Sequence, residues 1–344
     1  MSEDRLFPPE PDRGPASPET WAAADDRRQA ARAAAAMTDL FLDPRDRLHE
    51  QTRVAALAVI EAAVARLERD LRHLLGEAAG AASNLSVAER LTASGLLRDP
   101  PLIEEAVAQA RLAAIDAALV AQRAPGTSVD LIQRLSRSDD RKVRAATLAW
   151  LIAENARAQG DGDLPPALHR RTIWWVAAAL RERLPADAAT DRALAEAAER
   201  SIAAREETPD VVEAAAALAA AIDAAPADLP HLLPDVLAEG RTHLFVALLA
   251  HGLSLDAGEA RALVLDAEGD RLCYALRALG FTRPTIARVG WMLGEADMAR
   301  DVERLPGALD RCEAMTAQAA RRALATMALP APFRAAVRAL GRAA

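Results

Sequence analysis

The apolar residues between positions 57 and 74 are spaced alternately three and four residues apart. This set, called the 57–74 seam below, consists of Leu57, Ile60, Val64, Leu67, Leu71 and Leu74. Residues at this spacing share one face of an α-helix, so the pattern predicts a long helix over residues 50–76. Two arrangements fit the seam. It can face the core of the chain's own helical bundle, or it can form the interface of a homodimer.

Helix start and stop signals divide the chain beyond the seam into short helical units. Ser86 and Glu89 have the spacing of a capping box, and Asp99 stands directly before two prolines that suit a first helical turn. Further helices are expected over residues 141–157 and 165–184. The connections between these units are short, so consecutive helices should be antiparallel neighbours.

The expected helix over residues 141–157 carries apolar residues on two sides. Val143 and Trp150 belong to one stripe, and Leu148 and Ile152 lie roughly opposite. A helix that is apolar on two sides is typically buried between layers. The helix over residues 165–184 has the same two-sided pattern.

A short internal repeat links residues 247–254 to residues 275–282, 28 positions later. In both copies the pattern predicts a helix that ends at a left-handed glycine, Gly252 or Gly280, followed by a serine or threonine that caps the next helix. Stacked helical hairpins of this kind share a core that no single unit could form. We therefore predict an all-α fold: a HEAT-like helical-hairpin superhelix (α-solenoid) with an irregular N-terminal helical bundle.

Composition agrees with an all-α fold, because 86 of the 344 residues are alanine and only 3% are aromatic. The patterns divide the chain into four segments. These are a disordered Pro-rich N-terminus (1–20), an N-terminal helical segment with the long heptad helix (21–82), a helical-repeat body (83–305) and basic C-terminal helices (306–344).

The sequence lacks the residues that several common chemistries require. Lys142 is the single lysine and has no glycine-rich loop beside it, which argues against a phosphate-binding P-loop. Two cysteines, Cys273 and Cys312, are too few for a disulfide framework or a cysteine-based zinc site. We interpret His243 and His251 as surface or capping residues. No catalytic residue, cofactor or metal is therefore expected.

Charge and hydropathy restrict the partners and the location. The net charge is −8, which opposes a dedicated nucleic-acid binder. The N-terminus lacks an apolar signal core, and no uncharged stretch approaches the roughly 20 residues of a membrane-spanning helix. We expect a cytoplasmic protein with no membrane span.

One candidate partner-binding site contains Arg170, Arg171, Trp174 and Trp175. Neighbouring residues on a helix point about 100° apart, so one of the two tryptophans can remain outside the core. Tryptophan and arginine are favoured anchors in protein interfaces. The alternative is that both indoles pack between helical layers.

A second candidate lies near the C-terminus, where Arg334, Arg338 and Arg342 follow one another at four-residue spacing. A basic amphipathic helix there could enter a partner's groove or lie on an anionic surface. The alternative is a helix that caps the last repeat and complements an acidic body.

Three segments, residues 37–48, 164–181 and 275–280, resemble the bacterial family named domain of unknown function 2336. The resemblance extends over about residues 35–300. It implies an all-helical protein with HEAT-like character, and it carries no activity and no functional residue.

These patterns favour a non-catalytic protein–protein interaction scaffold or regulator built on helical repeats, whose partner is another protein. The first alternative is an enzyme of unrecognised type, in which a helical pocket gathers groups such as His169 and Arg170. A deep pocket with convergent acidic and histidine side chains would distinguish it from a scaffold. A nucleic-acid-binding solenoid is the remaining alternative.

Overall fold

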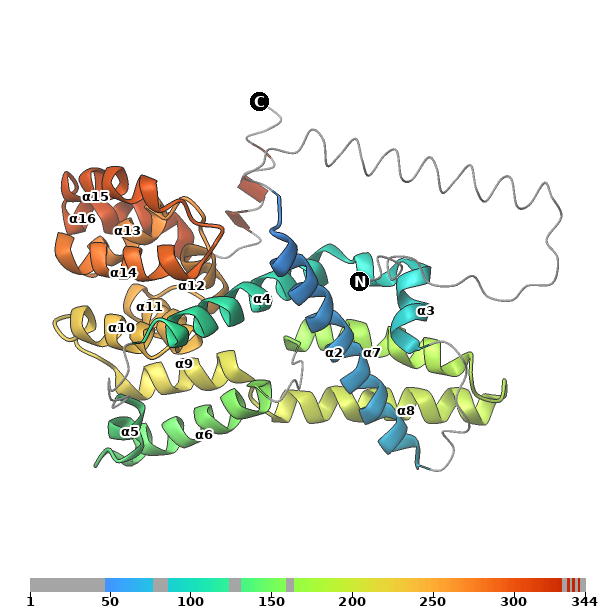
Figure 1. Ribbon diagram of the computed structural model, residues 1–344. Coiled ribbons are helices and arrows are strands. Elements are labelled where there is room, and N and C mark those ends of the chain that lie inside the picture. Colours follow the sequence, from blue (N-terminus) through green and yellow to red (C-terminus); the bar gives the residue numbers. More distant parts are fainter. Residues whose placement is uncertain are drawn as a thin grey trace, which may run out of the picture.

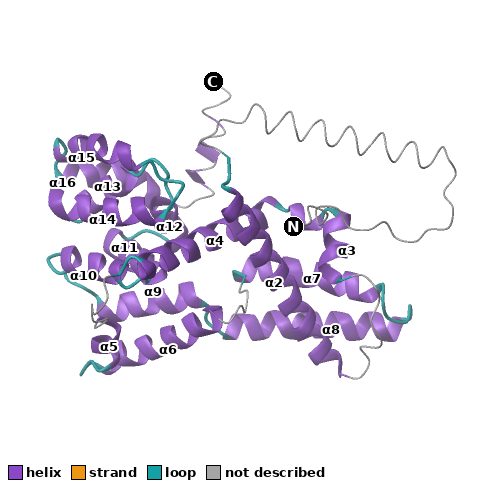
Figure 2. Ribbon diagram, in the orientation of Figure 1, coloured by secondary structure: helices purple, strands orange, loops and turns teal. Residues whose placement is uncertain are grey.

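The computed structural model describes residues 47–76, 86–123, 131–158 and 164–329, together with five positions between 333 and 340. Within these ranges the regular structure is entirely helical and contains no strand (Figure 2). The predicted all-α class is therefore confirmed. The disorder predicted for residues 1–20 lies outside the described residues.

The helices follow the boundaries that local chemistry sets. Ser86 and Glu89 form the predicted capping box, and Asp99 caps the helix that begins at the first of the two prolines. The long helix ends at Gly76, which has a positive φ of 64°. The α-helices are α2 (Glu50–Leu75), α3 (Val87–Ser94), α4 (Pro100–Ala121), α5 (Leu131–Ser136), α6 (Arg141–Ala158), α7 (Pro166–Arg181), α8 (Ala188–Glu207), α9 (Val211–Ile222), α10 (Leu229–Ala238), α11 (Thr242–Leu253), α12 (Ala257–Val264), α13 (Asp270–Ala278), α14 (Arg283–Ala296), α15 (Leu305–Glu313) and α16 (Ala317–Leu324).

The helices form two packed groups that α4 joins (Figure 1). Helices α2, α3, α7 and α8 make the first group, and α5, α6 and α9 to α16 make the second. Leu102 and Ala106 in the first half of α4 belong to the core of the first group, whereas Leu112 and Ile115 belong to the core of the second. One helix thus contributes to both cores.

The central part of the 57–74 seam lies in the core of the first group. Ile60, Val64, Leu67 and Leu71 are buried, and α2 packs on α3, α4, α7 and α8 of the same chain. Leu57 at the start of the seam is 49% exposed. The buried part of the seam is therefore occupied by contacts within the chain.

The prediction that α6 is buried on two sides is wrong. Val143 and Trp150 are buried as expected, but Leu148 is 50% exposed and Ile152 is 73% exposed. Helix α6 packs chiefly on α9 and α5, so nothing in the described chain covers its other face. Helix α7 does bury two sides, because it lies between α2, α3 and α8.

The left-handed glycine predicted for the internal repeat is found in the second copy only, and neither predicted cap forms. Thr282 precedes α14 without a capping hydrogen bond from its side chain, and α12 is capped by Asp256 instead of Ser254. Gly280 ends α13 with a φ of 87°, as predicted.

In the first copy of the repeat Ser254 takes the left-handed position with a φ of 54°, and Gly252 stays inside α11. A Cβ at Gly252 would lie 3.0 Å from a side-chain atom of Leu229 and 3.1 Å from one of Leu279. Gly252 thus allows close packing instead of ending the helix.

Candidate functional site

A cavity of about 340 Å³ lies where the two helical groups meet. Small apolar residues of α2 form one wall, and α4, α6, α9, α11 and α12 supply the others. The polar residues in the lining are Glu105, Gln109, Arg157, Asp210, His243 and Arg261. An apolar wall opposite a few convergent polar groups is typical of small-molecule sites.

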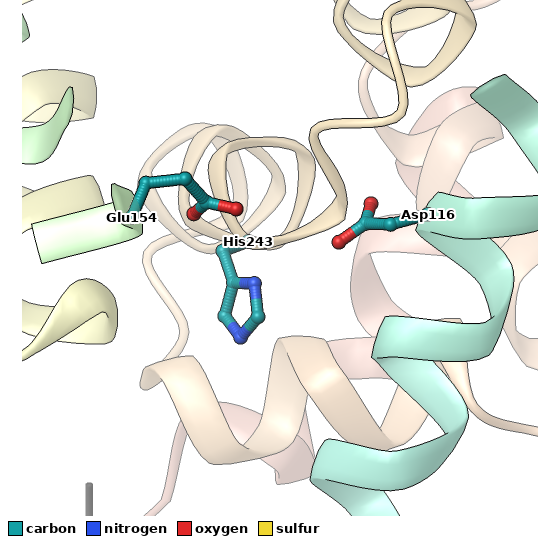
Figure 3. Close-up of side chains that lie close together, drawn as sticks. All are labelled: Asp116, Glu154 and His243. Atoms are coloured by element: carbon teal, nitrogen blue, oxygen red, sulfur yellow. The ribbon is translucent and has the colours of Figure 1, made fainter. Parts of the chain in front are cut away.

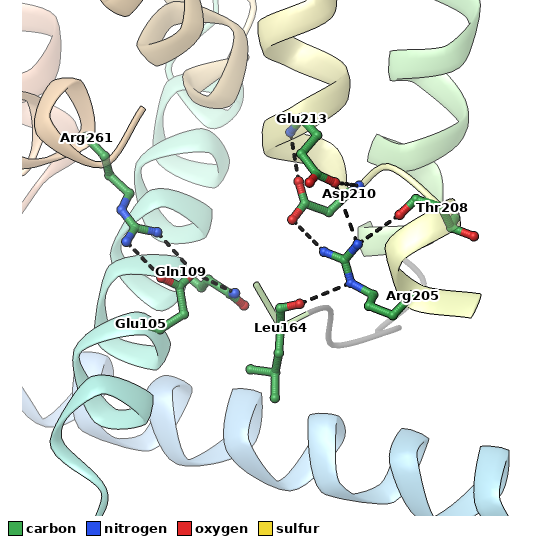
Figure 4. A network of polar contacts seen from close by, with 8 residues as sticks. All are labelled: Glu105, Gln109, Leu164, Arg205, Thr208, Asp210, Glu213 and Arg261. Atoms are coloured by element: carbon green, nitrogen blue, oxygen red, sulfur yellow. Dashed lines mark hydrogen bonds and ion pairs between the residues drawn. The ribbon is translucent and has the colours of Figure 1, made fainter. Parts of the chain in front are cut away.

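Ion pairs hold the polar side chains of this cavity in place (Figure 4). Arg261 of α12 donates two hydrogen bonds to Glu105 of α4, at 3.0 and 2.7 Å. Gln109, one turn further along α4, donates to the same carboxylate at 2.9 Å. The Glu105 side chain is only 8% exposed. Paired, hydrogen-bonded charges of this kind give a buried wall a fixed geometry.

Arg205 organises a second polar network around Asp210, which lines this cavity (Figure 4). It donates to the carboxylate of Asp210 at 2.7 Å and to the carbonyl oxygens of Leu164 at 3.2 Å and Thr208 at 2.8 Å. Asp210 in turn accepts from the backbone N–H of Glu213 and caps α9. The buried guanidinium therefore ties the end of α8 to the start of α9.

Behind the cavity, Asp116 of α4, Glu154 of α6 and His243 of α11 converge (Figure 3). We call these three residues the acid–histidine cluster. One ligand atom from each lies within 4.8 Å of those from the other two. Arg157 lies 2.7 Å from a Glu154 oxygen and 3.5 Å from an Asp116 oxygen. Because Arg157 and His243 also line the cavity, the cluster borders it directly.

Burial shifts the protonation of this cluster. It raises the pKa of Asp116 to about 6, against the opposing effect of the hydrogen bond from the Thr242 N–H. It lowers the pKa of His243 to about 4, with a further contribution from Arg157. His243 is therefore neutral at pH 7, and one ring nitrogen is free of a proton.

A second cavity, of about 280 Å³, lies among α2, α7 and α8. His169 is buried in it, with Nε2 3.2 Å from the hydroxyl of Ser201. Burial, followed by the charge of Arg205, lowers the pKa of His169 to about 4. Arg170 is exposed and pairs with Glu206. Of the two residues that were expected to share a pocket, His169 lines this cavity and Arg170 does not.

The depressed pKa of His169 predicts a pH dependence of stability. The unfolded chain binds a proton on this imidazole below pH 6.5, whereas the folded chain does so only near pH 4, so stability falls as pH drops through this window. The loss amounts to no more than about 3 kcal/mol. The variant His169→Gln should lose correspondingly less stability than the wild type between pH 7 and 4 in urea unfolding. An identical loss in both proteins would contradict the assignment.

Helix α7 places the two tryptophans of the predicted arginine–tryptophan site in different environments. Trp174 is 41% exposed, while Trp175 is half-buried against the core of the first group. Arg170 pairs with Glu206, and Arg171 with Asp99 at 2.7 Å. The indole of Trp174 thus lies on the surface beside ion-paired arginines, whereas the indole of Trp175 packs partly against the core.

Near the C-terminus, the described part of the predicted basic stripe contacts the body of the protein. Arg334 forms an ion pair with Glu259 of α12. Arg338 and Arg342 lie outside the described residues.

Sequence reasoning missed the acid–histidine cluster. His243 was expected at the surface, but it is 7% exposed because α11 is buried along Thr242–Ala250. The signals were present: His243 interrupts an almost wholly apolar helix, and Asp116 shares the face of Leu112 and Leu119. A polar residue on such a face is buried, and a buried charge needs a partner.

Fold and site together define an all-helical protein with two packed groups and a polar cavity at their junction. Residues 162–325 match the family model described as "Uncharacterised protein conserved in bacteria (DUF2336)". The resemblance is confirmed there, and the segment 37–48 lies outside the match. Comparisons with curated proteins and with solved structures yield no match.

Among the helices of the described ranges, none is both long enough and apolar enough to cross a membrane.

Proposed function

We propose that the protein is a non-catalytic interaction scaffold or regulator that binds another protein through the exposed face of α7. The observation that carries this proposal is the exposed indole of Trp174 on a rigid helix. Tryptophan is the residue type that most often dominates binding energy in interfaces. A HEAT-like superhelical arrangement and a cytoplasmic location belong to the same proposal.

The surroundings of Trp174 fit such a surface. Arg170, Arg171 and Arg181 lie on the same exposed face of α7, and each forms an ion pair with an acid. These pairs fix the guanidinium groups while leaving much of their surface accessible. An aromatic anchor within a polar rim is the usual anatomy of a non-obligate interface.

Affinity capture with the Trp174→Ala variant tests the proposal. We expect loss of the bound partner, with affinity falling at least tenfold, because truncation of an anchoring tryptophan costs about 2 kcal/mol or more. The matched control is Trp291→Ala on α14, whose indole is 55% exposed. Equal capture by the Trp174→Ala variant and the wild type would contradict the role of α7.

The second candidate function is that of an enzyme with a helical pocket, and the cavity lined by Glu105, Arg157 and His243 favours it. Under this candidate, Glu105→Gln should abolish a turnover that Trp174→Ala leaves intact. Under the scaffold proposal, Glu105→Gln should leave partner capture unchanged, since Glu105 is buried and belongs to α4.

A further inference from the structure

The acid–histidine cluster contains polar atoms that the protein leaves without hydrogen bonds. These atoms are Oδ2 of Asp116, Oε2 of Glu154 and Nδ1 of His243. All three residues are buried: His243 is 7% exposed, and the side chains of Asp116 and Glu154 are 12% and 11% exposed. Buried polar atoms are nearly always paired, so unpaired atoms on three converging side chains point to a water molecule, an ion or a ligand bound between them.

The three side chains enter this gap from different helices (Figure 3). Asp116 is held in place because its other oxygen, Oδ1, accepts the N–H of Thr242 at 2.8 Å. His243 follows Thr242 directly in α11, so the same hydrogen bond fixes α4 against the start of the helix that carries the imidazole. The donor set is therefore built on rigid elements and does not depend on a loop.

Arg157 only partly neutralises the two carboxylates. Its Nη2 hydrogen-bonds to Oε1 of Glu154 at 2.7 Å but lies 3.5 Å from Oδ2 of Asp116. With both carboxylates ionised, the cluster and Arg157 together carry one negative charge in excess. The imidazole of His243 adds a nitrogen donor, Nδ1, which has no hydrogen-bond partner in the protein, and imidazole nitrogens are common ligands of metal ions.

We propose that Asp116, Glu154 and His243 bind a divalent transition-metal ion, with Zn²⁺ as the best match to the ligands. An imidazole nitrogen with carboxylate oxygens suits Zn²⁺, whereas Ca²⁺ takes six to eight oxygens and Mg²⁺ keeps most of its water. The ligand atoms lie within 4.8 Å of one another. Donors at about 2.0–2.2 Å around a tetrahedral ion lie about 3.4 Å apart, so the three side chains must move together by roughly 1 Å to close the site.

Three protein ligands leave a coordination position free, as in catalytic zinc sites. Because His243 also lines the 340 Å³ cavity, a ligand entering that cavity could reach the free position. The metal site does not depend on partner binding by α7, so the two proposals are tested by separate experiments.

Titration of the chelator-treated full-length protein with Zn²⁺, and with Co²⁺ as a spectroscopic probe, tests the proposal. We expect one equivalent to bind, with a visible Co²⁺ absorption and no thiolate-to-metal band, since Cys273 and Cys312 take no part. Mg²⁺ and Ca²⁺ at the same concentrations should not displace it. The metal should also raise the unfolding midpoint of the wild type.

The variants His243→Ala and Asp116→Asn should each weaken Zn²⁺ binding at least tenfold. The near-isosteric Glu154→Gln provides a third test if either of them fails to fold, which far-ultraviolet circular dichroism would reveal. The matched control is His251→Ala, because His251 lies at the exposed end of the same helix beside Asp223. Absence of Zn²⁺ binding to the wild type, or undiminished binding to folded cluster variants, would overturn the proposal.

Discussion

The variant Leu67→Glu should lose its folded structure, or at least that of the helices around α2. Leu67 is 2% exposed and packs in the core of the first group. A carboxylate there would be desolvated without a partner, which costs several kcal/mol. The free energy of unfolding of a typical domain is only about 5–15 kcal/mol. Urea unfolding followed by circular dichroism measures this loss.

The matched control for this experiment is Leu57→Glu, which introduces the same charge into the same seam at a residue that is 49% exposed. It should change the free energy of unfolding by less than about 1 kcal/mol. If the seam were instead a dimer interface, Leu67→Glu would give a folded monomer from a dimeric wild type. Sedimentation of both variants distinguishes these outcomes.

The variant Arg205→Met should be destabilised by about 3–5 kcal/mol, the usual cost of removing one partner from a buried ion pair. The Arg205 side chain is only 5% exposed. Its loss removes the hydrogen-bond donor to Oδ2 of Asp210 and to the carbonyl oxygens of Leu164 and Thr208. The junction of α8 and α9 should loosen first. Hydrogen exchange at the start of α9 would report that local opening.

Arg170→Met provides the comparison, because the ion pair of Arg170 with Glu206 is about half exposed on both sides. Exposed pairs contribute about 0–1 kcal/mol, so this variant should unfold close to the wild-type midpoint. Equal destabilisation by both substitutions would show that the buried network around Arg205 has no special role.

Local chemistry made the helix boundaries predictable. Capping at Ser86 and Asp99 depends on neighbouring residues alone, so the sequence suffices to locate the starts of α3 and α4. The exposed face of α6 could not be predicted in this way. Whether Leu148 and Ile152 are covered depends on which distant helix packs there, and the hydropathy pattern was the same for either outcome.

The candidate sites show the same division between local and long-range information. Helix geometry allowed one of the two adjacent tryptophans to stay outside the core but also allowed both to pack between layers, and the structure leaves Trp174 exposed. The acid–histidine cluster joins residues from α4, α6 and α11, which no local spacing connects. Its members were visible only as isolated polar residues on apolar faces, and their convergence depends on the packing of the two helical groups.

The most direct test of the central claim is site-specific photocrosslinking at position 174. The tryptophan is replaced by benzoylphenylalanine in the full-length protein, cells of the native host are irradiated, and the adducts are identified by mass spectrometry. We expect a covalent adduct with one defined protein from position 174 and none from position 291, although Trp291 is the more exposed of the two residues. The absence of an adduct at position 174, or the same adducts from both positions, would contradict it.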